Sequence, residues 1–329
     1  MNLPIIGIDI DQEFFVACLL MGEKTQTRKF KNMPSGFREL SAWLGRWGVK
    51  VALACMEATG RYGEKLAEYL HAQGHKVAVV NPAFICSHKS TLNKHNKTDP
   101  NDADAIADYA RCFKSKLRLW EPKSPVHKAL IDVVGQMHML KKTITAFSNR
   151  GGCGIDSEDV RKLNEETLNH LKGQLEKLET LRDKLFDQLS ALREVRKILI
   201  SVPGIGGIIA DSLSAKIDFA NFRNGRDLAS FLGLGSREWK SGKQKRRGKQ
   251  TKAGNPQIRA LLRMGAMAVA YGEHSFFKEF ADRLRNQGLE EPQILTAVAR
   301  KIILIAHALV RKNQLFDCCF EHPLAKNAA

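Results

Sequence analysis

The first eighty residues contain short apolar runs that alternate with amphipathic segments. Five runs have the length and alternation expected of strands: 5–10, 14–20, 25–30, 49–56 and 76–80. Two segments between them, 36–47 and 62–73, carry apolar residues at helical spacing. Three successive strands followed by helix, strand, helix and strand predict an RNase H-like α/β domain. A Rossmann domain would alternate from its start and would contain a glycine-rich phosphate turn, which this sequence lacks.

The middle of the chain changes to a helical pattern. Residues 83–98 are polar and basic and predict a loop, whereas 99–112 predict a helix with Pro100 in its first turn. From about 158 to 197 the leucines follow a heptad. Arg182 interrupts position a, and position d is occupied by Leu171, Leu178, Leu185 and Leu192. This pattern predicts a coiled-coil connector, formed either antiparallel with the helix of residues 125–148 or between two chains.

The last third predicts a mostly α-helical domain that begins with a turn between two helices. The run Ser-Val-Pro-Gly-Ile-Gly at 201–206 is typical of a helix-hairpin-helix, in which the backbone around Gly204 and Gly206 binds phosphate. An ordinary Pro-Gly break between two helices is the alternative. The predicted organisation is therefore a first domain over 1–150, a connector over 151–200 and a C-terminal domain over 201–329.

Charge adds a partner to this picture because it is unevenly distributed. The 329 residues carry a formal net charge of +17, and 43% are hydrophobic, which is enough for packed cores. Residues 1–150 contain 22 basic and 14 acidic residues, the connector 9 and 10, and residues 201–329 contain 21 and 11. Two basic parts joined by a neutral one predict two surfaces that contact a polyanion such as nucleic acid.

The cysteines and the apolar runs indicate the cellular compartment of the protein. The seven cysteines show no metal-binding spacing and predict free thiols in a reducing cytoplasm. No signal peptide is expected, and the longest apolar runs, such as 302–310, are too short to cross a bilayer. We therefore expect a cytoplasmic protein with no membrane partner.

Four carboxylates are the strongest candidates for chemistry. Asp9 lies within the first predicted strand, and Glu57 directly follows the fourth. Asp99 and Asp102 are three residues apart at the start of a predicted helix. An acid in a buried strand is costly unless it is paired or binds a cation. Carboxylate oxygens suit Mg²⁺, and two-metal sites serve phosphoryl transfer. The pattern predicts a divalent metal site acting on nucleic acid, with Asp104 as a possible alternative ligand.

A second candidate lies in the basic segment 237–263, which holds ten basic residues and one acid. Ser241 precedes a glycine and has cations on both sides, so its hydroxyl could attack a phosphodiester. Ser236 and Thr251 are rivals, and no histidine is near in sequence to act as a base. The cations expected to bind nucleic acid are Arg237, Lys240, Lys243, Lys245, Arg246, Arg247, Lys249 and Lys252.

Taken in order, these motifs resemble those of a known family. The matching pieces are Gly7-Ile8-Asp9, Glu57-Ala58-Thr59-Gly60, 97–103 (Lys-Thr-Asp-Pro-Asn-Asp-Ala), Pro203-Gly204-Ile205-Gly206, Ser241-Gly242 and Lys252-Ala253-Gly254. The chain resembles the DEDD-type transposases of bacterial insertion sequences, which are bridge-RNA-guided serine recombinases. Each motif is weak alone, but six in the family's order are specific and span nearly the whole chain.

The resemblance implies a RuvC-like N-terminal domain that binds Mg²⁺ (or Mn²⁺) through Asp9, Glu57, Asp99 and Asp102. It implies a transposase domain in which Ser241 forms a transient covalent link to DNA. The implied partners are donor DNA, target DNA and a structured bridge RNA that chooses the sites by base pairing. The implied assembly is a homodimer, becoming a tetramer when the DNA ends are brought together in the bacterial nucleoid.

Two other functions remain open from the sequence. A metal-dependent Holliday-junction resolvase or nuclease would use the four carboxylates with water as the nucleophile, and Ser241 would only contact phosphate. A non-catalytic nucleic-acid-binding protein would require neither the carboxylates nor a divalent metal ion.

Overall fold

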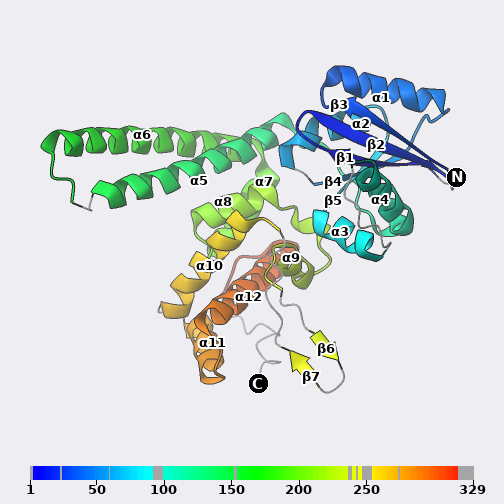
Figure 1. The fold of residues 1–329 in the computed structure, drawn as a ribbon. Coiled ribbons are helices and arrows are strands. Elements are labelled where there is room, and N and C mark those ends of the chain that lie inside the picture. The colour runs from blue at the N-terminus through cyan, green and yellow to red at the C-terminus, as the bar shows by residue number, and fades with distance from the viewer. Residues whose placement is uncertain are drawn as a thin grey trace. The chain divides into compact units, whose positions relative to one another are not determined.

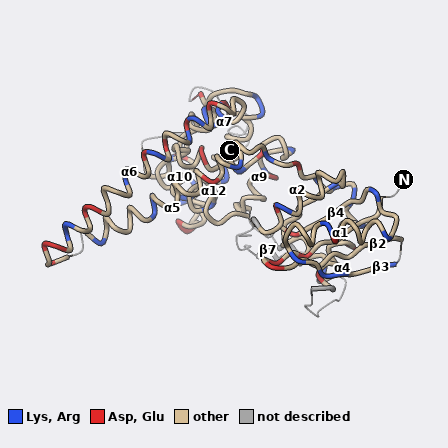
Figure 2. Tube along the Cα trace, turned by 90° about the horizontal axis from the view of Figure 1, so that it is seen from above, with Lys and Arg blue, Asp and Glu red and all other residues tan. Residues whose placement is uncertain are grey.

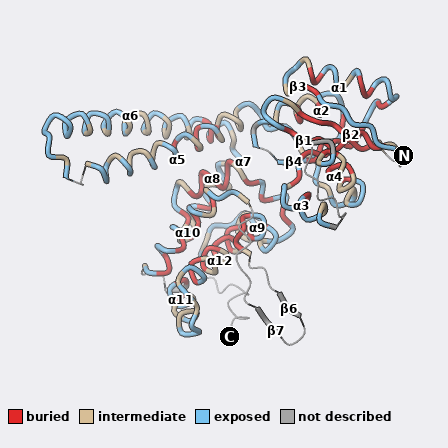
Figure 3. Tube along the Cα trace, viewed as in Figure 1, coloured by how far each residue is buried: buried red, intermediate tan, exposed pale blue. Residues whose placement is uncertain are grey.

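The computed structural model describes residues 3–22, 24–58, 60–91, 99–151, 154–235, 239–241, 244–246, 254–272 and 275–317. The chain divides into two compact units, residues 1–123 and 124–329. Each unit has its own hydrophobic core, and Figure 3 shows buried residues concentrated in the sheet of the first and in the helices of the second.

The first unit is built on a mixed five-stranded sheet in the order β3-β2-β1-β4-β5 (Figure 1). Strands β1 (Ile5–Ile10), β2 (Phe14–Met21) and β3 (Lys24–Lys31) form an antiparallel meander. Strands β4 (Leu53–Glu57) and β5 (Lys76–Val80) extend it in parallel on the other side of β1. The predicted mixed α/β sheet and its element order are confirmed.

Alternation along the strands divides the core of this unit into two layers. Ile6, Ile8 and Ile10 pack against helices α1 (Pro34–Arg46) and α2 (Glu64–Ala72), the latter preceded by the 3-10 turn Gly60–Gly63. On the opposite face, Ile5, Leu53 and Cys55 pack against α4 (Asp99–Cys112). A short 3-10 turn, Lys114–Lys116, follows α4. Polar residues of these strands that face α4 therefore lie between sheet and helix.

The loop prediction for 83–98 is wrong in its first half. Residues Pro82–Thr91 form helix α3, because Asn81 accepts a hydrogen bond from the Ala83 N–H at 2.9 Å and caps the helix. Pro82 then occupies the first turn, where a missing N–H costs nothing. The side chain of Ile85 is 1% exposed and anchors α3 in the core. Residues 92–98 lie outside the described part of the chain.

The second unit begins with two long helices, α5 (Pro125–Gly151) and α6 (Glu158–Gln188). They run antiparallel, since Lys141 pairs with Glu179 at 3.0 Å and the Asn164 side chain donates to the Phe147 carbonyl at 3.5 Å. Heptad leucines of α6 pack against Leu130, Val133, Val134 and Met137 of α5. Of the two pairings that the sequence left open, the structure contains the one within the chain. Basic and acidic residues are interspersed along α6, as Figure 2 shows.

The helical segment predicted over 158–197 is interrupted. Leu189 departs from helical geometry (φ −120°, ψ 65°), and α7 (Ser190–Ser201) starts anew. Arg182, which breaks the heptad, donates to buried Asp211 at 3.1 Å, and Arg196 of α7 pairs with the same carboxylate at 2.5 Å. Arg182 therefore serves the packing of α6 on α8 (Gly207–Lys216) and not the leucine seam.

The remaining core surrounds α10 (Pro256–Tyr271) and α12 (Glu291–Lys312), with α9 (Gly225–Phe231), α11 (Ser275–Asn286) and the 3-10 turn Phe219–Asn221 around them. By length and composition alone α12 could cross a membrane, because it extends beyond the predicted apolar run 302–310. Nine of its residues are nevertheless buried, as in the central helix of a helical domain. Strands β6 (Trp239–Ser241) and β7 (Gln244–Arg246) pair as a small antiparallel ribbon within the basic segment 237–263.

Candidate carboxylate site and nucleic-acid interface

Asp9 and Glu57 occupy equivalent places on neighbouring parallel strands. The register of β1 and β4 pairs Ile8 with Met56, so Asp9 and Glu57 come next at the carboxyl ends of both strands. Asp9 is four residues after Ile5 on β1, and Glu57 is two residues after Cys55 on β4, so both acids share the sheet face that packs against α4. Both acids are partly buried. Side chains at the carboxyl ends of adjacent parallel strands lie where ligands of α/β sheets bind.

Helix α4 lies directly on this part of β1. A Cβ atom added to Gly7 would be 2.2 Å from the Ala103 carbonyl oxygen and 2.3 Å from the Ala107 nitrogen. Only glycine permits such a close approach of strand and helix backbones. The first turn of this same helix contains Asp99 and Asp102. The side chain of Asp99 lies outside the described part of the structure.

Asp102 and Asp104 already have partners on neighbouring elements. The Asp102 carboxylate accepts from the Lys89 ammonium of α3 at 2.6 Å, with both side chains mostly buried. The Cys18 thiol of β2 points to the Asp104 carboxylate at 3.8 Å. Among the described side chains, Asp9, Glu57 and Asp102 do not form a group of three with ligand atoms within 4.8 Å of one another. The structure thus aligns Asp9 with Glu57 and gives Asp102 a cation.

Glu57 is the carboxylate best suited to a cation. It is partly buried, yet it makes no hydrogen bond or ion pair with any described residue. A half-buried carboxylate of this kind is stabilised by a positive charge. Lys89 beside Asp102 shows that the first turn of α4 also attracts a cation. The donor set consists of carboxylate oxygens, which fit a hard divalent ion, so the residues present fit the implied metal.

Sequence reasoning missed a cluster in the C-terminal half of α4. His88 of α3 lies 2.8 Å from the Asp108 carboxylate, and Cys112, Asp108 and His88 have ligand atoms within 4.8 Å of one another. Burial raises the pKa of Asp108, but hydrogen bonds from His88 and Arg111 outweigh it and lower the pKa. Asp108 and Cys112 are four apart on a helix, a spacing visible in the sequence. His88 was hidden because its segment was predicted to be a loop. The cluster ties α3 to α4.

The predicted nucleophile lies in the second unit. Ser241 ends β6 and pairs with Gln244 of β7, and Lys240 pairs with Lys245. Arg246 ends the same ribbon, opposite Trp239. Arg237, Lys243, Arg247, Lys249 and Lys252 lie outside the described residues. The ribbon's backbone therefore brings two predicted nucleic-acid-binding lysines to adjacent positions beside the serine.

The turn predicted to be a helix-hairpin-helix joins α7 to α8. Gly204 has a left-handed conformation (φ +86°), and a Cβ added to Gly265 of α10 would lie 2.0 Å from the Gly204 carbonyl oxygen. Gly204 thus permits the turn, and Gly265 permits the close approach of α10 to it. Gly206 and Gly207, at the start of α8, are exposed. Phosphate binding at this turn stays a prediction.

Two parts of the chain match known families of transposases. Residues 6–151 match a family described as "Transposase" (DEDD_Tnp_IS110), and residues 196–281 match one described as "Transposase IS116/IS110/IS902 family". These matches define a DNA transposase or recombinase. The chain belongs to the IS110 family of insertion-sequence transposases.

Relatives extend over nearly the whole chain. The pilin gene-inverting protein of Moraxella bovis is 30% identical over 325 residues, which cover 96% of this chain and 98% of the relative. The transposase for insertion sequence element IS1111A of Coxiella burnetii is 25% identical, covering 96% and 92% of the two chains. A solved structure of T. thermophilus RuvC in complex with a Holliday junction substrate aligns with 36% of this chain and 100% of its own, at 12% identity and a TM-score of 0.27.

Proposed function

We propose that this transposase cuts and rejoins donor and target DNA through a serine nucleophile and a carboxylate-bound Mg²⁺ site. The observation that carries the proposal is the alignment of Asp9 with Glu57, whose carboxylate has no partner among the described residues. Asp99 and Asp102, in the first turn of the helix seated on Gly7, complete the ligand set. Bound there, divalent ions would stabilise the charge that develops on a scissile phosphate.

The chain's own groups then perform an exchange of phosphodiester bonds. The Ser241 oxygen attacks phosphorus, the bond from phosphorus to one strand's oxygen breaks, and that strand leaves as a free hydroxyl. The serine gives up its proton, and the leaving oxygen gains one. A hydroxyl of the other DNA then attacks the phosphoserine, which restores a phosphodiester and the serine hydroxyl. The number of phosphodiester bonds is conserved, so rejoining needs no external energy source.

The partners follow from charge and from family membership. Residues 201–329 contain 21 basic and 11 acidic residues, and this excess of positive charge supports contact with polyanions. We propose donor and target DNA, and a bridge RNA that selects them by base pairing. A dimer or tetramer would let the carboxylates of one protomer act with the serine of another.

The sequencing yield of the excised circular junction in a bacterial host tests this function. Asp9→Asn and Ser241→Ala should each abolish the junction at unchanged protein level. Asp11→Asn is the matched control, because Asp11 is an exposed turn residue two positions beyond Asp9. Junctions at the wild-type level in Asp9→Asn would contradict the carboxylate site.

One observation favours a second candidate, a resolvase-like nuclease with water as the nucleophile. The carboxylates lie in a compact unit with its own core, and Ser241 lies in the other unit. Strand cleavage that persists in Ser241→Ala but disappears in Asp9→Asn would favour this candidate over the serine recombinase.

A further inference from the structure

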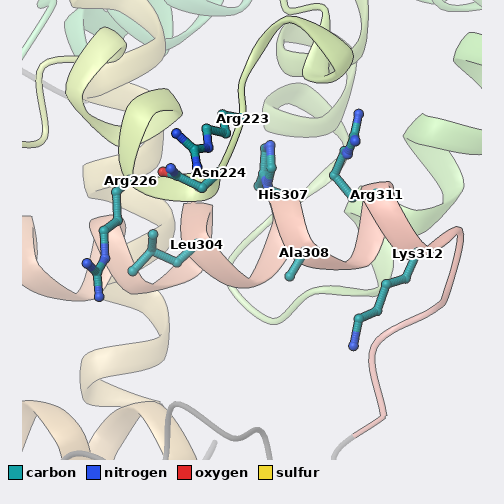
Figure 4. A pocket seen from close by; sticks show the side chains of 9 residues that line it. Arg223, Asn224, Arg226, Leu304, His307, Ala308, Arg311 and Lys312 are labelled. Carbon is teal, nitrogen blue, oxygen red and sulfur yellow. The ribbon is translucent and has the colours of Figure 1, made fainter.

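A hollow of about 500 Å³ lies in the second unit, between the start of α9 and the last turns of α12 (Figure 4). Among the described residues, four cationic side chains and no acidic side chain line it: the cations are Arg223, Arg226, Arg311 and Lys312. None of its lining residues belongs to the carboxylate site or to the ribbon that carries Ser241. Its volume falls within the range of about 300–1,000 Å³ typical of ligand sites.

Three of these cations are available to a ligand. Arg223, Arg226 and Arg311 are exposed, and none forms an ion pair or hydrogen bond within the described part of the chain. Elsewhere in this unit, arginines are commonly paired with acids, as Arg193 is with Asp187 at 3.1 Å. Gathering like charges without acids is unfavourable unless an anion binds among them.

The hollow is held in shape by buried contacts. The His307 ring is 4% exposed, and its Nε2–H donates to the Phe222 carbonyl at 3.1 Å, which fixes the backbone next to Arg223. A Cβ added to Gly225 would lie 3.0 Å from the Cα of Leu304, so the start of α9 rests directly on α12. The cations are therefore presented from two elements whose separation is fixed.

The dimensions of the hollow suit a nucleic-acid strand. From Leu304 to Arg311 the lining follows α12 for seven residues, which at 1.5 Å per residue is about 10 Å. One strand carries a phosphate about every 3.4 Å along a duplex axis, so two to three phosphates fit this length. Leu304 and Ala308 supply an apolar floor on which a sugar can rest.

We propose that this hollow binds the phosphodiester backbone of a nucleic-acid partner through residues other than those proposed for strand exchange. The identity of the ligand rests on the proposed function, whereas the preference for a polyanion rests on the hollow itself. DNA and RNA share the backbone chemistry that these cations recognise. Binding here would hold a strand in register without reading its bases.

Binding of oligonucleotides at several salt concentrations tests the proposal. Single-stranded RNA, single-stranded DNA and duplex DNA of one sequence are compared by fluorescence anisotropy. The slope of log K against log salt is negative, and each phosphate contact makes it steeper. With the oligonucleotide that binds in the hollow, the double variant Arg223→Gln/Arg311→Gln should make the slope shallower, by about 0.7 per lost contact on a single strand or about 0.9 on a duplex. Arg161→Gln on α6 is the control, since Arg161 is paired with Glu158 at 3.3 Å. Wild-type slopes with all three oligonucleotides would overturn the proposal.

A measurement on the wild-type protein makes the test independent of folding of the variants. Labelling with phenylglyoxal, read by mass spectrometry, should show Arg223, Arg226 and Arg311 protected by the oligonucleotide and Arg161 unprotected. Equal labelling with and without nucleic acid would overturn the site. The binding measurement needs no strand cleavage, so failure of the catalytic proposal, which is read from the junction yield, is distinguished from failure of this one.

Discussion

Replacing Gly7 by alanine should separate α4 from the sheet without altering any carboxylate. The added Cβ would lie 2.2 Å from the Ala103 carbonyl oxygen, whereas ordinary contacts begin at 3.4 Å. The helix must therefore retreat by roughly 1 Å, because packed interiors have no free space to absorb the methyl group. Overpacking of this kind costs about 1–3 kcal/mol of stability. A shift of about 1 Å in a catalytic group can lower a rate about 100-fold.

The assay combines urea unfolding with the yield of the excised junction. Gly7→Ala should lose about 1–3 kcal/mol of unfolding free energy and about 100-fold in junction yield. Gly45→Ala is the matched control in the same unit, since Gly45 is exposed on α1 and an added Cβ meets nothing within 4 Å. That control should gain about 0.5–1 kcal/mol, as glycine is a poor helix former. Wild-type stability and yield in Gly7→Ala would refute the seating of α4 on β1.

Two further predictions concern buried polar groups. Asp211→Asn should lower the free energy of unfolding, measured by chemical denaturation, by about 3 kcal/mol, because the 3%-exposed Asp211 carboxylate is the shared partner of Arg182 and Arg196. Asp183→Asn is the control: its side chain is 58% exposed, and its loss should lower that free energy by less than about 1 kcal/mol. Equal losses would contradict this. Burial lowers the pKa of His75 from 6.5, so the unfolded chain binds the proton first and stability should fall as pH drops below 6.5. His75→Gln should remove that part of the pH dependence, and an unchanged profile would count against it.

Much of the first unit could be predicted because its signals are local. Alternation along β1 and the apolar run of β4 located both strands, and a parallel sheet then aligns Asp9 with Glu57. The start of α3 was missed because Asn81 and Pro82 follow directly on β5 and resemble a strand-ending turn, whereas in the structure they also begin the helix. The interruption at Leu189 was missed because the leucine pattern continues through it.

Tertiary features were beyond the reach of sequence patterns. The pairing of α6 with α5 depends on a complementary apolar surface on α5, which a heptad does not specify. Arg223 and Arg311 are 88 residues apart, and only the packing of α9 on α12 brings them to one hollow. Lys89 beside Asp102 likewise follows from the placement of α3.

Capture of a covalent protein–DNA complex tests the proposed serine nucleophile most directly. Purified protein, guide RNA and DNA containing the excised junction are incubated with Mg²⁺, denatured, and separated by gel electrophoresis. A covalent complex is expected with wild type and with Ser236→Ala, and none with Ser241→Ala or Asp9→Asn. A complex that forms with Ser241→Ala, or with Asp9→Asn, would contradict a single site shared by the serine and the carboxylates.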